Sequence, residues 1–190
     1  MTAFYYEDEV FNNQDYADQD LRKKEFVDCK FVSCDFSNAD LSGTDFIDCQ
    51  FESCNLSMLK VLGTGFKTVT FTDCKMIGID FQVCNDFLLQ LSFSHCQLDF
   101  TNFSQKKLVK TSFADCKIEN ADFAEADLKG ASFTGADLHL TNFDQTKLEE
   151  ADFRSAYNYR IDPTQNKLKG AQFSSHGLAG LLDRFDIIVE

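Results

Sequence analysis

The sequence predicts an all-β solenoid with four-sided coils, and two spacings carry that prediction. Large apolar residues, mostly Phe and Leu, recur every five positions over most of the 190 residues. From Ala121 to Phe153, the residue two positions before each of them is no larger than Thr. A helix would scatter every fifth residue around its axis, and a long strand would send successive fifth residues to opposite faces. The chain must therefore turn a corner once in every five residues.

The five-residue unit assigns a direction to each of its positions. If the large residue is called i, then i−2 and i point inward along a short extended segment and i−1 points outward. Positions i+1 and i+2 form the corner. Stacked coils of such corners enclose a core that is filled by i and i−2. The pattern is clearest from Ala121 to Phe153, where Phe and Leu alternate at every fifth residue.

The cysteines indicate how many sides each coil has. Seven of the eight occupy the i−2 position, as expected for small buried residues. Within the register, four pairs of cysteines lie 20 residues apart and one pair lies 15 apart, which favours four sides of five residues. No CxxC pair is present, so we expect reduced thiols, no metal and no disulfide. Cys84 departs from the register and is expected to be the most reactive thiol.

The repeat divides the chain into three expected parts. Residues 1–20 are acidic and weakly periodic, with Phe11 and Tyr16 on the register that follows. They are expected to form an N-terminal cap, because charged or irregular segments at the end of a solenoid discourage end-to-end association. Residues 21–175 are expected to form a β-helix of about seven coils. Its register slips within 82–87, because the next large residue after Phe81 is Leu88. A kinked corner and a loop that contacts a partner both remain open explanations.

Residues 176–190 form the third part, a C-terminal tail. Leucines and a phenylalanine at spacings of three and four predict a short C-terminal helix, and an apolar strand-like run follows at 187–189. The helix could close the open end of the core, or it could form a homodimer contact in which a patch meets its own copy. The expected dimer residues are Leu178, Leu181, Leu182, Phe185 and Ile187.

Composition limits the possible partners. The net charge is −13 and the pI is about 4.5, so direct binding to nucleic acid or to an anionic membrane is not expected. The N-terminus has no signal peptide and no apolar run reaches 18 residues, so we expect a soluble, cytoplasmic protein. The sequence lacks the P-loop, GxGxxG and HExxH motifs; we therefore expect no enzyme activity and no cofactor.

The acidic residues are not evenly distributed. Residues 1–52 contain 13 acids and 4 bases, residues 53–110 contain 4 and 6, and residues 111–190 contain 14 and 8. In a four-sided coil Glu25 stacks on Asp45 and Asp28 stacks on Asp48. The predicted partner-binding acidic face consists of Glu25, Asp28, Asp45, Asp48, Asp122 and Asp127. Such a face either keeps the protein soluble or places rows of carboxylates in a groove built for nucleic-acid phosphates.

The units of ADFAEADLKGASFTGADL resemble the A(D/N)LXX repeat of the pentapeptide-repeat family. This resemblance implies a right-handed quadrilateral β-helix. The stretch FVDCKFVSCDFSNADLSGTDFIDCQFESCNLS resembles the N-terminal coils of Qnr-type quinolone-resistance proteins. The ending, with TNFDQTKLEEADF, IDP and GLLDRFDIIVE, is similar to that of the immunity protein against a gyrase-directed microcin.

The narrower resemblances imply a function. They imply a homodimeric, non-enzymatic DNA mimic that binds type II topoisomerase, either DNA gyrase or topoisomerase IV, and protects it against quinolones or peptide toxins. The long loops that project from many Qnr proteins are missing here, so weak protection against quinolones is expected. The alternative function is a pentapeptide-repeat scaffold that binds another cytosolic partner.

Overall fold

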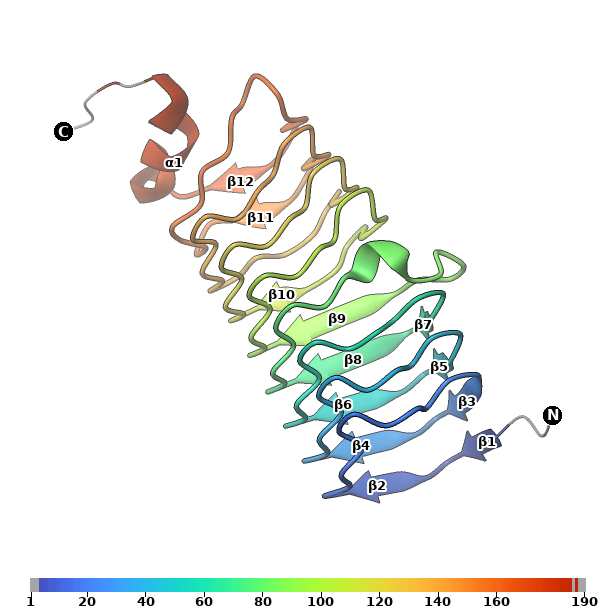
Figure 1. The fold of residues 1–190 in the computed structure, drawn as a ribbon. Coiled ribbons are helices and arrows are strands. Elements are labelled where there is room, and N and C mark those ends of the chain that lie inside the picture. Colours follow the sequence, from blue (N-terminus) through green and yellow to red (C-terminus); the bar gives the residue numbers. More distant parts are fainter. Residues whose placement is uncertain (1–3, 186, 188–190) are drawn as a thin grey trace.

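The protein is an all-β solenoid of about eight turns that ends in one short helix (Figure 1). The structure, a computed structural model, describes residues 4–185 and 187. Successive coils lie one on top of the next, so the two ends of the described chain lie at opposite ends of the rod. Every pair of named strands is parallel, which is the arrangement that stacked coils require.

The regular elements are short because a corner interrupts the chain every five residues. The strands are β1 (Phe4–Glu7), β2 (Val10–Asn12), β3 (Lys24–Val27), β4 (Lys30–Val32), β5 (Asp45–Ile47), β6 (Gln50–Glu52), β7 (Gly65–Lys67), β8 (Val69–Thr72), β9 (Leu91–Ser94), β10 (Phe113–Ala114), β11 (Asp152–Phe153) and β12 (Gln172–Phe173). The helical segments are η1 (Phe81–Val83), η2 (Ser175–Gly177), α1 (Ala179–Leu182) and η3 (Asp183–Phe185).

The coils have four faces, numbered here in chain order. Face 1 carries the sheet β1-β3-β5-β7, and face 2 carries the sheet formed by β2, β4, β6, β8, β9 and β10, followed by β11 and β12. On faces 3 and 4, successive coils are joined by isolated β-bridges: Asp35 bridges Asn55 on face 3, and Asp20 bridges Asp40 on face 4. Paired residues in the first coils differ by 20 in number, as in Phe31 with Phe51. The predicted four-sided coil is therefore confirmed.

Stacked rings fill the interior. On face 2 a Phe occupies the inward position of coil after coil, and the ring centroids of Phe31 and Phe51 are 4.7 Å apart with planes inclined by 12°. On face 1 the inward residue is aromatic up to Phe66 and Leu from Leu108 onward. Face 4 shows the opposite change, with Phe from Phe81 onward. The two exchanges compensate each other and keep the core filled along the rod.

Outward Asp and Asn residues hold the corners together. Asp35 Oδ1 accepts a hydrogen bond from the backbone N–H of Ser37 at 2.8 Å, and Asp122 Oδ1 accepts one from that of Ala124 at 2.9 Å. The last corner residue has a positive φ, as at Asp28 (51°) and Asp48 (52°). Asp and Asn suit both positions, because they accept bonds from nearby backbone and tolerate the left-handed conformation. Many of the acidic residues therefore serve the fold.

The eight cysteines are free and buried, which confirms that they pack in the interior. Burial raises the pKa of Cys49 and Cys84 to about 12, so both remain protonated thiols at neutral pH. The prediction that Cys84 lies outside the inward register is wrong. Its side chain is 6% exposed and occupies the inward i−2 position of its coil.

Backbone pairing between coils locates the insertion. Asn85 bridges Gly65, a difference of 20 residues, whereas Leu91 pairs with Val69, a difference of 22. The two extra residues therefore lie between Asn85 and Leu91, a range that overlaps the predicted 82–87 at residues 86 and 87. Leu88, expected to point inward, is 65% exposed.

The N-terminal segment also differs from the prediction. Residues 4–20 form a regular coil and are not weakly periodic in structure: β1 pairs with β3, and the centroid of the Tyr6 ring lies 4.9 Å from that of Phe26. This extra coil explains why the rod has about eight turns and not seven. At the other end the register survives the interruption after Phe153, since Phe173 stacks on that ring at 5.2 Å.

Candidate partner-binding face

The structure brings four of the six predicted acidic residues together. Glu25 in β3 is paired in register with Asp45 in β5, so their side chains form an outward column on face 1. Asp28 and Asp48 occupy the corner that follows, and both are exposed. The N-terminal coils therefore carry two parallel columns of carboxylates. Within each column, successive residues are about 4.8 Å apart along the rod.

The other two predicted residues lie elsewhere. Asp122 is on face 4, where it bridges Asn102. Asp127 is on face 1 but beyond the insertion, in a column between Lys107 and Lys147. The six residues therefore do not form one acidic face.

The carboxylates also differ in what they contact. Asp122 accepts a hydrogen bond from Asn142 Nδ2 at 3.0 Å in addition to its corner bond, and Asp127 pairs with Lys147 Nζ at 3.3 Å. Asp45 pairs with Lys67 Nζ at 3.1 Å. No ion pair formed within residues 4–185 involves the three remaining carboxylates, those of Glu25, Asp28 and Asp48. These three are free to meet a basic partner.

Face 1 changes the sign of its charge at the insertion. Beyond it, the outward column and the adjoining corner carry exposed lysines where the first coils carry acids: Lys107, Lys110, Lys129, Lys147, Lys167 and Lys169. Asp127 was predicted to share an acidic face with Glu25, but the outward column that contains both residues changes from acids to lysines across the insertion. The bridges from Lys107 to Asp127, Lys147 and Lys167 establish the order.

A loop at 85–90 projects from face 1 at this point (Figure 1). The side chains of Phe87 and Leu88 are each 65% exposed. Lys67 Nζ lies 6.0 Å from the centroid of the Phe87 ring. A hollow lies on either side of the loop: one is lined on the rod by Ile47, Asp48, Lys67 and Thr68, the other by Lys107 and Val109.

The loop is held from inside the rod by Lys106. This lysine occupies an i−2 position, normally filled by a small residue, and is 4% exposed. Its Nζ donates to the carbonyl oxygen of Cys84 at 2.8 Å and to Asp86 Oδ1 at 2.6 Å. A buried ammonium requires such partners. A lysine between Cys84 and Ala126 in the same inward column was the sequence feature that could have revealed this contact.

The predicted dimer residues separate into two groups. Leu181 packs against the core of its own rod and Leu182 is half-buried. Leu178, Phe185 and Ile187 remain exposed, at 45%, 49% and 56%. The rest of the apolar run expected at 187–189 lies outside the described residues.

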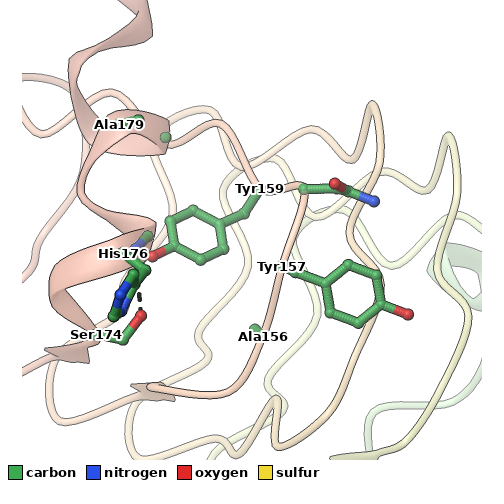
Figure 2. A pocket seen from close by; sticks show the side chains of 9 residues that line it. Ala156, Tyr157, Tyr159, Ser174, His176 and Ala179 are labelled. Carbon is green, nitrogen blue, oxygen red and sulfur yellow. Dashed lines mark hydrogen bonds between the residues drawn. The ribbon is translucent and has the colours of Figure 1, made fainter. Parts of the chain in front are cut away.

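The tail is seated on the last coil through Tyr159 (Figure 2). The Tyr159 ring points toward the helical turn that carries His176, and burial raises the pKa of its phenol. Its hydroxyl is one of the buried side-chain atoms without a hydrogen-bond partner in the described structure. A Cβ at Gly180 would lie 2.3 Å from the Tyr159 carbonyl oxygen, so only glycine permits this approach. The backbone N–H of Ile161 donates to the Gly180 carbonyl at 2.9 Å.

Residues 4–185 and 187 contain no cluster of three or more His, Cys, Asp or Glu side chains that could hold a metal ion. None of the helices in this part of the chain is long and apolar enough to cross a bilayer.

Solved structures show the same fold at low sequence identity. A trypsin-treated variant of QnrB1, described as a plasmid-mediated fluoroquinolone resistance protein, has a TM-score of 0.62 at 20% identity and covers 100% of both chains. A second trypsin-treated variant also gives 0.62, at 21% identity, over 99% of this chain and 98% of that chain. Full-length QnrB1 gives 0.57 at 18% identity, over 96% of this chain and 100% of that chain. No curated protein sequence matches significantly. A family model described as a pentapeptide repeat region matches residues 24–103 and 66–139, and the chain therefore belongs to the pentapeptide-repeat family.

Proposed function

We propose that this protein is a non-enzymatic, cytoplasmic binder of type II topoisomerase, either DNA gyrase or topoisomerase IV, that modulates the enzyme or protects it against quinolones or peptide toxins. The observation that carries the proposal is the pair of carboxylate columns formed by Glu25 with Asp45 and Asp28 with Asp48. They are fixed on a rigid sheet, so little ordering is required on binding. A basic surface that grips DNA phosphates accepts such an array through charge and shape. The similarity of the fold to QnrB1 adds support.

The test is inhibition of gyrase supercoiling, with and without a gyrase poison. Reversing Glu25, Asp28, Asp45 and Asp48 to Lys should abolish inhibition or protection, because the array then repels the basic surface. Lysine is compatible with the left-handed corners, since Lys23 and Lys110 already have positive φ values. Reversing Asp115, Glu125, Asp144 and Glu150, which are exposed on the later coils, changes the net charge equally and should retain activity.

Two results would contradict this function. One is a wild-type protein that neither inhibits nor protects at micromolar concentration. The other is a protein reversed at the four N-terminal positions that acts as well as the wild type. A protein-interaction scaffold with another cytosolic partner is then the better description, and the exposed Phe87 and Leu88 favour that second function.

The proposal includes a homodimer formed by the tail. Leu178, Phe185 and Ile187 leave apolar surface in water, which a twofold contact can cover. Replacing Leu178 and Phe185 by Asp should give a folded monomer in sedimentation experiments, whereas replacing exposed Leu62 by Asp should have no effect. A wild-type protein that is monomeric at micromolar concentration would rule out this contact.

A further inference from the structure

Face 1 is divided by the loop at 85–90 into two halves of equal length. Four inward positions on this face precede the loop and four follow it: Tyr6, Phe26, Phe46 and Phe66, then Leu108, Leu128, Leu148 and Leu168. The loop therefore lies at the middle of the rod. A twofold axis through the loop would superpose two antiparallel rods along their whole length.

The two halves carry opposite uncompensated charges. In the first half Glu25, Asp28 and Asp48 belong to none of the ion pairs formed by residues 4–185. The two lysines of that half are engaged, Lys67 by Asp45 and Lys24 by the rings of Phe4 and Tyr6. In the second half Asp127 and Glu150 are paired with Lys147 and Lys129, and half-buried Glu149 is the one carboxylate of this half outside the ion pairs of the described chain. Its lysines outside the ion pairs of the described chain are Lys107, Lys110, Lys167 and Lys169.

We propose that face 1 is a self-complementary surface through which a second copy of this chain docks antiparallel, with the 85–90 loops of the two copies meeting at the twofold axis. An isologous contact repeats every pairing twice. The acidic half of each copy faces the basic half of the other, which is the charge complementarity that specifies register and partner. This docking requires no topoisomerase.

The loop supplies the apolar centre of this contact. Phe87 and Leu88 project between two hollows, one on the side of Ile47 and Thr68 and one on the side of Lys107 and Val109. Loops that pass side by side can each enter a hollow of the other copy. Lys106 fixes the loop from within through Asp86 and the Cys84 carbonyl, so the apolar residues are already arranged before binding.

The size of the face predicts a weak, salt-sensitive dimer. About eight turns at about 4.8 Å each, and a width of roughly 15 Å, give on the order of 1,200 Å² over both copies. That is the lower end of specific interfaces. Formation of this dimer covers Glu25, Asp28 and Asp48, so it would compete with any basic partner for the same carboxylates.

The test uses the full chain with Leu178→Asp and Phe185→Asp, which removes any contact made by the tail. Sedimentation at about 100 μM should show a dimer at about 50 mM salt, and raising the salt to about 300 mM should weaken it at least tenfold. Replacing both Phe87 and Leu88 by Ser should also dissociate it. Melting followed by circular dichroism checks that each variant stays folded.

Charge-reversed variants test the proposed pairing of the acidic half with the basic half. The variant Glu25→Lys, Asp28→Lys, Asp48→Lys has a basic face 1, and the variant Lys107→Glu, Lys110→Glu, Lys167→Glu has an acidic one. Each alone should be monomeric, and an equimolar mixture should form a heterodimer. The second variant retains the acidic columns and should still bind topoisomerase if the proposed function holds. A parent that is monomeric at low salt, or a mixture that does not associate, would overturn face-to-face dimerisation.

Discussion

The coils before and after the insertion share one interior and carry different surfaces. On both sides a Phe of face 2 is fully enclosed, as at Phe51 and Phe133 with 1% and 0% exposure. On face 1, however, the column of Glu25 and Asp45 is replaced by that of Lys107, Asp127 and Lys147. The repeat constrains the inward positions, because they must fill a core of fixed width. It leaves most outward positions free to carry partner recognition.

The largest effect is expected from the interior. Phe51→Ala and Phe133→Ala each remove a ring sandwiched between two others, and each should lower the free energy of unfolding by about 3–5 kcal/mol. Denaturant unfolding measures this loss, with exposed Leu62→Ala as a control expected to cost less than about 0.5 kcal/mol. If the two Phe variants differed by more than about 2 kcal/mol, the two halves would not obey the same packing rule.

Substitutions at the junction between the halves should cost less stability. Removing the exposed partner, Asp86, should cost more than removing the buried charge, Lys106. Asp86→Ala leaves the buried Lys106 ammonium with only the Cys84 carbonyl as partner, and should cost about 1–3 kcal/mol. Lys106→Met removes the buried charge itself and should cost less, about 1 kcal/mol. The comparison is made by denaturant unfolding and by hydrogen exchange of residues 85–90. A Lys106→Met variant less stable than Asp86→Ala would show that the ion pair is not what holds the loop.

A local effect is expected where the tail covers the second half. Gly180→Ala places a methyl group against the Tyr159 carbonyl and should detach residues 175–185 from the last coil. We expect fast hydrogen exchange there and earlier tryptic cleavage at Arg184, with less than about 1 kcal/mol lost by the rod. Ala179→Ser, at an exposed neighbouring position, is the matched control. Unchanged exchange in Gly180→Ala would mean that the tail is not seated through this contact.

The sequence predicted the interior well because its constraint is local and periodic. The five-residue spacing identified inward Phe51 and Phe133, and the 20-residue spacing of cysteines identified the four sides. The position of the insertion could not be found in this way, because Leu88 fits the period as well as any inward residue. Backbone pairing determines the position of the insertion. Leu91 pairs with Val69 and occupies the inward i−2 position before Phe93, whereas Leu88 lies in the loop and is exposed.

The candidate face was only partly predictable for a related reason. Stacking of Glu25 on Asp45 followed from the coil length, and the structure places them in register. Asp122 looked equivalent in sequence, yet its carboxylate accepts hydrogen bonds from the backbone N–H of Ala124 and from Asn142 Nδ2. An Asp in the outward position satisfies the corner whether or not a partner uses it, so composition alone overestimates the binding face. The buried Lys106 was missed because a charge inside the rod is stable only with the partners that folding brings to it.

The smallest expected effect is the contribution of these corner carboxylates to the pH dependence of stability. In both halves, protonating them should destabilise the fold. Hydrogen bonds from the Ser37 side chain and backbone lower the pKa of Asp35, the Ser42 side chain does so for Asp40, and Arg154 does so for Asp152. A carboxyl whose pKa is lowered by folding stabilises the protein above the pKa of the unfolded chain, which is about 4. That stabilisation is lost as the pH falls through the lowered value. The wild-type melting temperature should therefore drop below about pH 4.

Asparagine separates the charge of these residues from their corner bond. Its side-chain oxygen also caps corners here, as Asn102 does for the backbone N–H of Ser104 at 2.9 Å. Asp35→Asn with Asp40→Asn in the first half, and Asp152→Asn in the second, should keep stability at pH 7 within about 0.5 kcal/mol and reduce the loss on acidification. Melting curves between about pH 2 and pH 7 measure this. If the substitutions flattened the acid profile in one half only, the outward carboxylates of the other half would not share the structural role that the repeat assigns to them.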